Sequence, residues 1–444
     1  MNPTMLRLAF DDTDSLKGMC TTFLATEMIR EFSNLDLIGY PRLVRLNPNV
    51  PWKTRGNGAL CLRLGTGGGR SYKIGECDGR EVRAWSKCEG SPRPGDIIPR
   101  AVAVLEKWAE LGDDLTNPAI TVFSRQPSQA FYWRAVRDVV KISDARREAD
   151  RAGIWRAYKN GRGIVGCVGA AAWRPRDRTY EVLTYRPSAR WGTDRVIDED
   201  SVVKMDRRFH STFNNYDYLN RKVTIAPSSP CPILFGIRAD TPDDLETAMR
   251  TIKGEKANRW FIFETNQGTD DHLVRATRKL RPHTSVIIEG RVDGSPKVMA
   301  GGHVVFRLDR GGGVDCAVYE PSKQFRRVAR ALLPGDRIIV CGSVREEPRT
   351  INVEKLRITE LVRDRKKISN PQCPSCGKRM KSIGRGAGFR CMNCGTKAPF
   401  DAGIWKAVRR RLRVGWYEPP VSARRHISKP LRRMGVRANP YPPK

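Results

Sequence analysis

The chain has 444 residues, which suits three or four domains of about 100–150 residues each better than one hydrophobic core. Hydrophobic residues make up 39% of it, so folded domains are expected rather than general disorder. It carries 81 Lys and Arg against 48 Asp and Glu, a formal net charge of +33. This excess predicts a polyanionic partner, the alternative being a merely basic surface.

Other classes of protein are excluded. The first ten residues lack the long apolar core of a signal peptide, and no run reaches the roughly 18 apolar residues of a membrane span, so no membrane is expected as a partner. The 12 cysteines are too sparse for a disulfide scaffold, and four of them form two CxxC pairs. We therefore expect a cytoplasmic protein with one metal site.

The positive charge is concentrated at the C-terminal end. Residues 361–444 carry 22 basic and 3 acidic residues, a net charge of +19. The preceding 360 residues carry 59 and 45, a net charge of only +14. The C-terminal fifth is therefore predicted to be the main electrostatic contact with a polyanion.

The first elements are predicted to be a strand, a loop and a helix. Apolar and other residues alternate over residues 6–10, which is typical of a strand, and Leu24, Met28 and Phe32 recur at the spacing of one helix face. The glycine-rich stretch Gly65–Arg100 is expected to be a surface excursion of this first domain.

Gly161, Gly163 and Gly166 match the GxGxxG pattern of dinucleotide sites. No clear strand precedes them, so close packing in a small α+β domain is the better interpretation. This second domain would continue through a helix at Ala239–Arg250 to about Arg281.

The next segment is predicted to be an OB-fold, a small barrel that often binds single-stranded nucleic acid. Its order is three strands, a helix and two strands. The expected strands are Val286–Val292, His303–Asp309, Val314–Tyr319, Asp336–Val344 and Ile351–Leu361, with the helix at Lys323–Leu332.

The two CxxC pairs predict a structural zinc ribbon, because four thiolates complete a tetrahedral shell and leave no open position. The ligands are Cys373, Cys376, Cys391 and Cys394. Basic residues near them favour nucleic acid as the partner, although zinc ribbons also bind proteins or serve as scaffold; they are Lys378, Arg379, Lys381, Arg385 and Arg390. The tail Ser422–Arg433 could clamp phosphates or be a solvated extension.

An acidic loop follows the first strand. Asp11, Asp12 and Asp14 repel one another unless a cation neutralises them, and Mg²⁺ bound to phosphates is the natural candidate. Lys17 and Gly18 follow, and Thr21 and Thr22 stand at the start of a helix that could bind phosphate; a capped surface turn is the alternative.

A second loop combines cations, glycines and an asparagine. Lys53, Arg55 and Asn57 lie ahead of a predicted strand at residues 60–64. This composition suits contacts with nucleotide or RNA phosphate, although rigid turns share it.

These motifs resemble the archaeal tRNA(Ile) 2-agmatinylcytidine synthetase family. The resemblance rests on DDTDSLKGMCTT (residues 11–22), PRLVRLNPNVPWKTRGNGA (41–59), TNPAI (116–120), the stretch from RWGTDR to FNNYDY (190–218), CPSCGKRMKSIGRG (373–386) and HISKPLRR (426–433). It implies a multidomain α+β protein: a kinase-like α/β catalytic domain (1–155), a ferredoxin-like domain (156–282), an OB-fold (283–364) and a zinc ribbon with a basic tail (365–444).

The resemblance also implies the reaction. ATP would phosphorylate the C2 oxygen of the wobble cytidine in the CAU anticodon of isoleucine tRNA, and agmatine would displace the phosphate, giving agmatidine, AMP and phosphate. Asp11, Asp12 and Asp14 would hold Mg²⁺ and ATP, and Thr21 would match the family's phosphorylated threonine.

Agmatine needs a carboxylate for its guanidinium, and Asp217 beside Tyr216 has the right composition, although the aromatic residues could equally be core. No obligate protein partner is evident. The rival interpretation is a non-enzymatic protein that binds single-stranded nucleic acid through the OB-fold and zinc ribbon. It leaves the acidic loop without a role, and ATP turnover separates the two.

Overall fold

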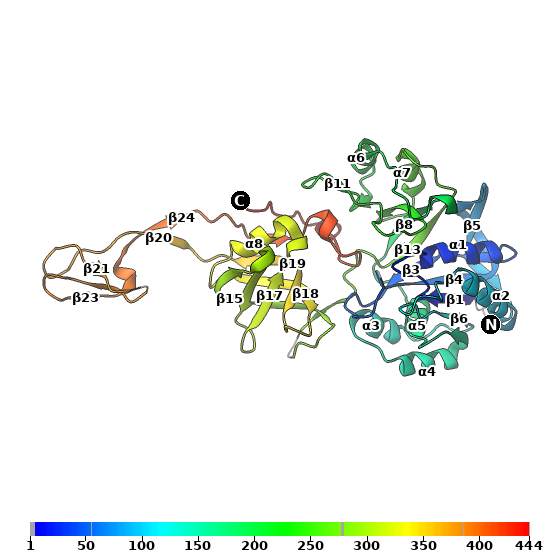
Figure 1. The fold of residues 1–444 in the computed structure, drawn as a ribbon, viewed down its shortest axis with the longest axis horizontal. Coiled ribbons are helices and arrows are strands. Elements are labelled where there is room, and N and C mark those ends of the chain that lie inside the picture. The colour runs from blue at the N-terminus through cyan, green and yellow to red at the C-terminus, as the bar shows by residue number, and fades with distance from the viewer. Residues whose placement is uncertain (1–4, 55, 277–278, 385, 444) are drawn as a thin grey trace.

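The computed structural model describes residues 5–54, 56–276, 279–384 and 386–443. It has three parts along its long axis: a large mixed α/β head, a small β-barrel and a four-cysteine ribbon at the far end (Figure 1). The predicted multidomain α+β architecture is confirmed. No helix among the described residues has the length and apolar character needed to cross a membrane.

The head is built on one 11-stranded sheet with the order β7-β6-β1-β4-β3-β13-β8-β12-β9, and β2 and β5 flank β4. Strands from both of the first two predicted domains pair in it, through β13 with β3 and β4. The strands are β1 (Leu6–Asp11), β2 (Asp36–Ile38), β3 (Arg42–Arg45), β4 (Gly58–Cys77), β5 (Arg80–Gly90), β6 (Ala119–Phe123), β7 (Gly153–Ala157), β8 (Thr179–Tyr185), β9 (Thr212–Phe213), β12 (Ile233–Ala239) and β13 (Arg259–Thr265).

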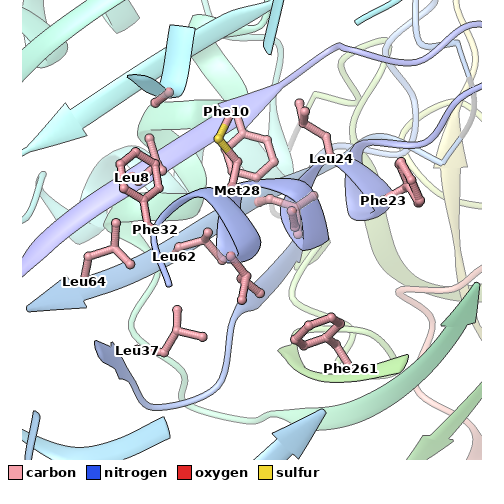
Figure 2. Close-up of a cluster of buried hydrophobic side chains, with 14 of the residues drawn as sticks. Leu8, Phe10, Phe23, Leu24, Met28, Phe32, Leu37, Leu62, Leu64 and Phe261 are labelled. Atoms are coloured by element: carbon pink, nitrogen blue, oxygen red, sulfur yellow. The ribbon is translucent and has the colours of Figure 1, made fainter. Parts of the chain in front are cut away.

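The alternation in β1 places its side chains in two cores. Leu6, Leu8 and Phe10 pack against α1 (Thr21–Glu31) and α2 (Pro94–Trp108), as Figure 2 shows around α1. Ala9 faces the second core, which holds α3 (Gln129–Arg137), α4 (Ile142–Ala152) and α5 (Ile164–Ala172). The predicted first strand and helix are therefore present, and the sheet lies between two layers of helices.

Two expectations for the head need correction. The glycine-rich stretch is not a loose excursion: β4 and β5 form a long hairpin whose tip pairs with β13, for example Cys77 with Arg259. The helix expected from residue 239 begins later, as α7 (Leu245–Thr251), because the strand β12 runs to Ala239 and a turn follows it. The remaining elements of the head are α6 (Glu199–Arg208), β10 (Tyr216–Asp217) and β11 (Lys222–Val223).

The barrel contains the five predicted strands, and their pairing closes a ring in the order β15-β16-β17-β19-β18, with β18 back on β15. The predicted helix is shorter than expected, because a 3-10 turn occupies residues 320–325 and only α8 (Arg326–Arg330) is α-helical. The strands are β15 (Ser285–Val298), β16 (Val304–Leu308), β17 (Val314–Val318), β18 (Arg337–Val344) and β19 (Ile351–Glu360), with β14 (Leu273–Arg275) and β25 (Gly415–Tyr417) added at its sides.

The ribbon projects from the barrel on two paired strands, β20 (Asp364–Ser369) and β24 (Ile404–Val408) (Figure 1). It contains β21 (Lys381–Ser382), β22 (Phe389–Arg390) and β23 (Lys397–Ala398).

After the ribbon the chain comes back to the head in residues 421–434, here called the return segment. Ile427 is buried in the head's second core, and the Arg433 guanidinium lies 3.0 Å from Asp177 and 2.5 Å from Asp240. The backbone N–H of Asp270 donates to the carbonyl of Ile427. The return segment is therefore not a solvated extension, because it is part of the folded head.

Candidate functional site

The head contains a cavity of about 860 Å³ beyond the end of β1. Its walls come from parts of the chain far apart in sequence: the acidic loop, the start of α1, the loop before β4, the start of α5, strands β8 and β12, and the return segment. Several residues predicted to bind the substrate or a metal ion meet here, namely Asp11, Asp12, Asp14, Thr21, Thr22, Lys53 and Asn57.

The acidic loop is held open by specific contacts. Asp12 has a left-handed backbone (φ 58°), which turns the chain directly after β1. Its carboxylate lies 3.3 Å from the Arg162 guanidinium and accepts a hydrogen bond from the backbone N–H of Asn117. The Thr54 hydroxyl donates to Asp14 over 3.1 Å, which ties the acidic loop to the loop before β4.

Asp11 is the most enclosed of the three carboxylates. Its Oδ2 lies directly against Gly166 of α5, where an added Cβ would stand only 1.8 Å from that oxygen. Burial, followed by the charge of Asp12, raises the pKa of Asp11 well above its usual value. The carboxylate therefore lacks the positive charge that would ionise it, and a divalent cation would supply that charge.

The same contact explains the GxGxxG glycines. Gly163 lies against the backbone of Asp11 and Asn117, and Gly166 leaves room for the Asp11 side chain. Close packing is the role of these two glycines, as the sequence indicated.

The start of α1 forms the neighbouring wall. The Thr13 hydroxyl donates to that of Thr21 over 3.1 Å, and Thr22 contacts the Cys20 sulfur. Lys17 is exposed, and neither it nor Gly18 lines the cavity.

Lys53 and Asn57 bring the second predicted loop to the cavity. Burial, followed by the charge of Arg425, lowers the pKa of Lys53 to about 8. Asn57 has a left-handed backbone (φ 45°), and its amide donates to the carbonyl of Asn47 over 2.7 Å. Arg55 lies outside the described residues.

The cavity also has a basic wall, which the sequence analysis did not find. Arg45 of β3 and Arg238 of β12 line it, together with Arg424, Arg425 and His426 of the return segment. No local motif marks Arg45 or Arg238, because only the pairing of the sheet brings these strands together. The basic motif of the tail was the one available signal for the other three.

Asp217 and Tyr216 are not among the residues that line the cavity. Asp217 accepts hydrogen bonds from the Ser422 hydroxyl and from the amide of Asn220. Tyr216 is packed in a hydrophobic core with Val202 and Met205. Their positions agree with the structural alternative and give no support to an agmatine site.

The four cysteines of the ribbon converge as the spacing predicted. The sulfurs of Cys373, Cys376, Cys391 and Cys394 all lie within 4.8 Å of one another. Four thiolates at this separation fit one tetrahedral zinc ion. Lys378, Arg379, Lys381 and Arg390 are exposed around them, and Arg385 lies outside the described residues.

Family models match most of the chain. The model described as the TiaS TCKD domain matches residues 7–161, the TiaS FLD domain matches 161–272, and the TiaS C-terminal zinc ribbon domain matches 370–412. The chain belongs to the TiaS family. The resemblance found in the sequence is thereby confirmed.

Relatives of TiaS type match over nearly their whole length. The 2-agmatinylcytidine synthetase TiaS of Methanocaldococcus jannaschii, named for isoleucine tRNA type 2, is 39% identical over 96% of this chain and 98% of its own. A crystal structure of TiaS in complex with isoleucine tRNA type 2 and ATP is 37% identical, with a TM-score of 0.84 over 99% of this chain and 100% of that one. A complex of TiaS with the same tRNA type, AMPCPP and agmatine is 34% identical, with a TM-score of 0.81 over the same shares.

Proposed function

We propose that this protein uses ATP to join agmatine to C2 of the wobble cytidine of CAU-anticodon isoleucine tRNA. The observation that carries the proposal is the single cavity in which the acidic loop, the start of α1 and a basic wall face one another, in a chain that belongs to the TiaS family. The TiaS relatives whose complexes contain isoleucine tRNA type 2, ATP and agmatine support it.

The acidic side of the cavity is suited to phosphoryl transfer, which depends on positioning and on neutralising charge. Asp11, Asp12 and Asp14 would hold Mg²⁺, which when bound would offset the charge of the ATP phosphates. They do not form a ready-made metal cage among the described residues, and Mg²⁺ needs only one or two carboxylates when phosphate supplies other ligands. Thr21, Thr22, Lys53 and Asn57 would contact the nucleotide.

The chemistry explains why ATP is needed. The C2 oxygen of cytosine is a poor leaving group, and phosphorylation lets it depart as phosphate. Overall, ATP, tRNA, agmatine and one water would give modified tRNA, AMP and two phosphates. The target base must leave the anticodon stack to enter the cavity.

We also propose a division of labour within the chain. Residues 1–155 would be the kinase-like catalytic domain, 156–282 a ferredoxin-like domain, 283–364 an OB-fold, and 365–444 the zinc ribbon with its tail. The order of strands around the closed ring supports the OB-fold. The barrel and the basic ribbon would hold the body of the tRNA, with zinc in a structural role.

Nucleoside mass spectrometry tests the proposal. The full chain is incubated with ATP, Mg²⁺, agmatine and CAU-anticodon isoleucine tRNA, and the tRNA is then digested. The expected product is a cytidine heavier by agmatine minus water, which disappears when lysine or spermidine replaces agmatine. Tight tRNA binding with no adduct and no AMP would instead identify a nucleic-acid-binding protein.

A further inference from the structure

The basic wall of the cavity contains donors that the protein does not use. The Nε atoms of Arg45 and Arg238 are both buried, and neither has a hydrogen-bond partner among the described residues. Arg238 lies 3.0 Å from the Glu181 carboxylate, an ion pair that leaves this N–H unsatisfied. Two arginines with spare donors on one cavity wall are suited to a bound anion.

His426 lies on the same wall and is held there by its backbone. The N–H of Gly268 donates to the His426 carbonyl over 2.8 Å, and the next residue, Ile427, is buried in the head's core. The His426 side chain itself is exposed and lines the cavity. An anchored backbone with an imidazole open to the cavity is the arrangement of a group that meets a ligand.

Charged groups from three strands and the return segment surround this imidazole. Arg238 of β12 and Arg45 of β3 act on it directly, Glu181 of β8 is paired with Arg238, and Arg425 precedes it in the chain. Arg238, then burial within the cavity, then Arg45 lower the pKa of His426 well below its usual value. The ring is therefore neutral at neutral pH and can accept a proton.

Arg45 also connects the basic wall to the acidic loop. The charges of Glu181 and Asp14 both act on its guanidinium, so the two sides of the cavity lie within electrostatic reach of each other. A phosphate held near the acidic loop could therefore contact the arginines without leaving the cavity.

The proposed reaction needs both functions at its second step. The amine of agmatine is an ammonium ion at neutral pH and must lose a proton before it can attack C2. The phosphoryl group on the cytidine is an anion, and it leaves with the C2 oxygen. The acidic loop serves the first step, which leaves the second without a base.

We propose that His426 is the general base for the attack of agmatine, and that Arg45 and Arg238 bind the phosphoryl group on the target cytidine. This inference rests on the proposed function and adds catalytic residues to it. As the C2–N bond forms, the imidazole takes one proton from the amine. The C2–O bond breaks, its electron pair stays on the phosphate oxygen, and the phosphate takes the second proton.

The charges would also set the order of the two steps. Before phosphorylation, the two arginines disfavour an imidazolium ion. A phosphate bound to them neutralises their charge, so His426 becomes able to hold a proton only when the activated cytidine is present. Agmatine would then be deprotonated in the cavity after phosphorylation and not before.

Separate assays of the two steps test the inference. The full-length His426→Gln variant is given tRNA and ATP labelled in its β- and γ-phosphates, first without agmatine and then with it. We expect the label on tRNA to form at nearly the wild-type rate, whereas the agmatine adduct forms about 10²–10⁴-fold more slowly. His210→Gln, which changes an exposed histidine of the head, is the matched control.

The pH dependence provides a second readout. Without its base, the variant depends on agmatine that is already neutral, so its adduct rate should rise about tenfold per pH unit below the amine pKa, more steeply than the wild type. Equal loss of both steps, or an unchanged adduct rate, would overturn the inference. If the Gln variant does not fold, His426→Asn replaces it. If the wild-type protein itself labels no tRNA and makes no adduct, the proposed function fails instead.

Discussion

At the scale of single residues, the acidic side of the cavity depends on one close contact. The Asp11 carboxylate is buried against Gly166, and Asp12 turns the chain through a left-handed conformation. The sequence predicted that the aspartates and the glycines matter, and it treated them as separate motifs. Their contact joins residues 155 positions apart, and no local pattern reports such a pairing.

Replacing Gly166 by alanine should damage the acidic loop from behind. The new Cβ would lie 1.8 Å from Asp11 Oδ2 and 2.4 Å from Asp11 Cγ, so the carboxylate must move. We expect a loss of about 1–3 kcal/mol in unfolding free energy and ATP binding weakened at least about tenfold. Calorimetric titration of ATP measures the second effect. Gly95→Ala in the first turn of α2, where an added Cβ meets nothing within 4 Å, should change neither quantity unfavourably.

Asp12→Asn isolates the charge of the acidic loop from its shape. The amide oxygen can still accept the hydrogen bond from Asn117, but the negative charge opposite Arg162 is lost. We expect phosphate transfer to tRNA to fall by about 10²–10³-fold, with tRNA affinity unchanged. Rapid-quench and filter-binding measurements give the two values. Asp114→Asn, on an exposed position, should leave both at the wild-type level, and a variant that retains full transfer would contradict a metal-binding role.

At the scale of elements, the sequence predicts best where periodicity and turns agree. The alternation in β1, the helix face of α1 and the five strands of the barrel are each encoded locally. The hairpin β4–β5 was missed because glycine normally disfavours strands. Here Gly75 lies within 3 Å of Phe261 and Trp260, so the glycine permits the hairpin to pair with β13.

The ribbon is an element whose stability must come from metal. Its own hydrophobic cluster is limited to two of the cysteines, Met380 and Phe389, with Ala398 at the side. Cys376→Ser should therefore release zinc and unfold the ribbon while the head remains folded. We expect weaker tRNA binding, by about tenfold or more, because the exposed basic side chains lose their fixed positions.

Metal analysis and filter binding at fixed salt check this expectation. Cys88→Ser in β5, far from the cluster in sequence, should keep both zinc and affinity. Zinc loss with unchanged tRNA affinity would reduce the ribbon to a scaffold.

At the scale of the whole molecule, the head and the barrel are joined by buried charges. Glu354 of β19 lies 2.9 Å from His272 and 3.1 Å from Arg425, and Lys355 lies 2.5 Å from Asp270. The return segment therefore contacts the cavity and the barrel at once. The sequence indicated the basic character of this segment, but its place depends on the arrangement of all three parts.

Glu354 gives this junction a defined pH dependence. Burial raises its pKa, but Arg425, His272 and Lys355 lower it further, to about 2. A carboxylate whose pKa is lower in the folded state stabilises the fold above its unfolded pKa, near 4.5, and this stabilisation is lost as the pH falls toward 2. The lost contribution is about 3 kcal/mol.

Glu354→Gln should remove that dependence and leave the buried cations without their partner. We expect the variant to be about 3–5 kcal/mol less stable than the wild type at pH 7, with the difference shrinking between pH 4.5 and 2. Urea unfolding of both proteins across this range measures it. Glu360→Gln near the end of the same strand, where the side chain is 52% exposed, should cost less than about 1 kcal/mol at any pH. A constant difference between wild type and Glu354→Gln at all pH values would mean that the carboxylate contributes packing rather than charge to the junction.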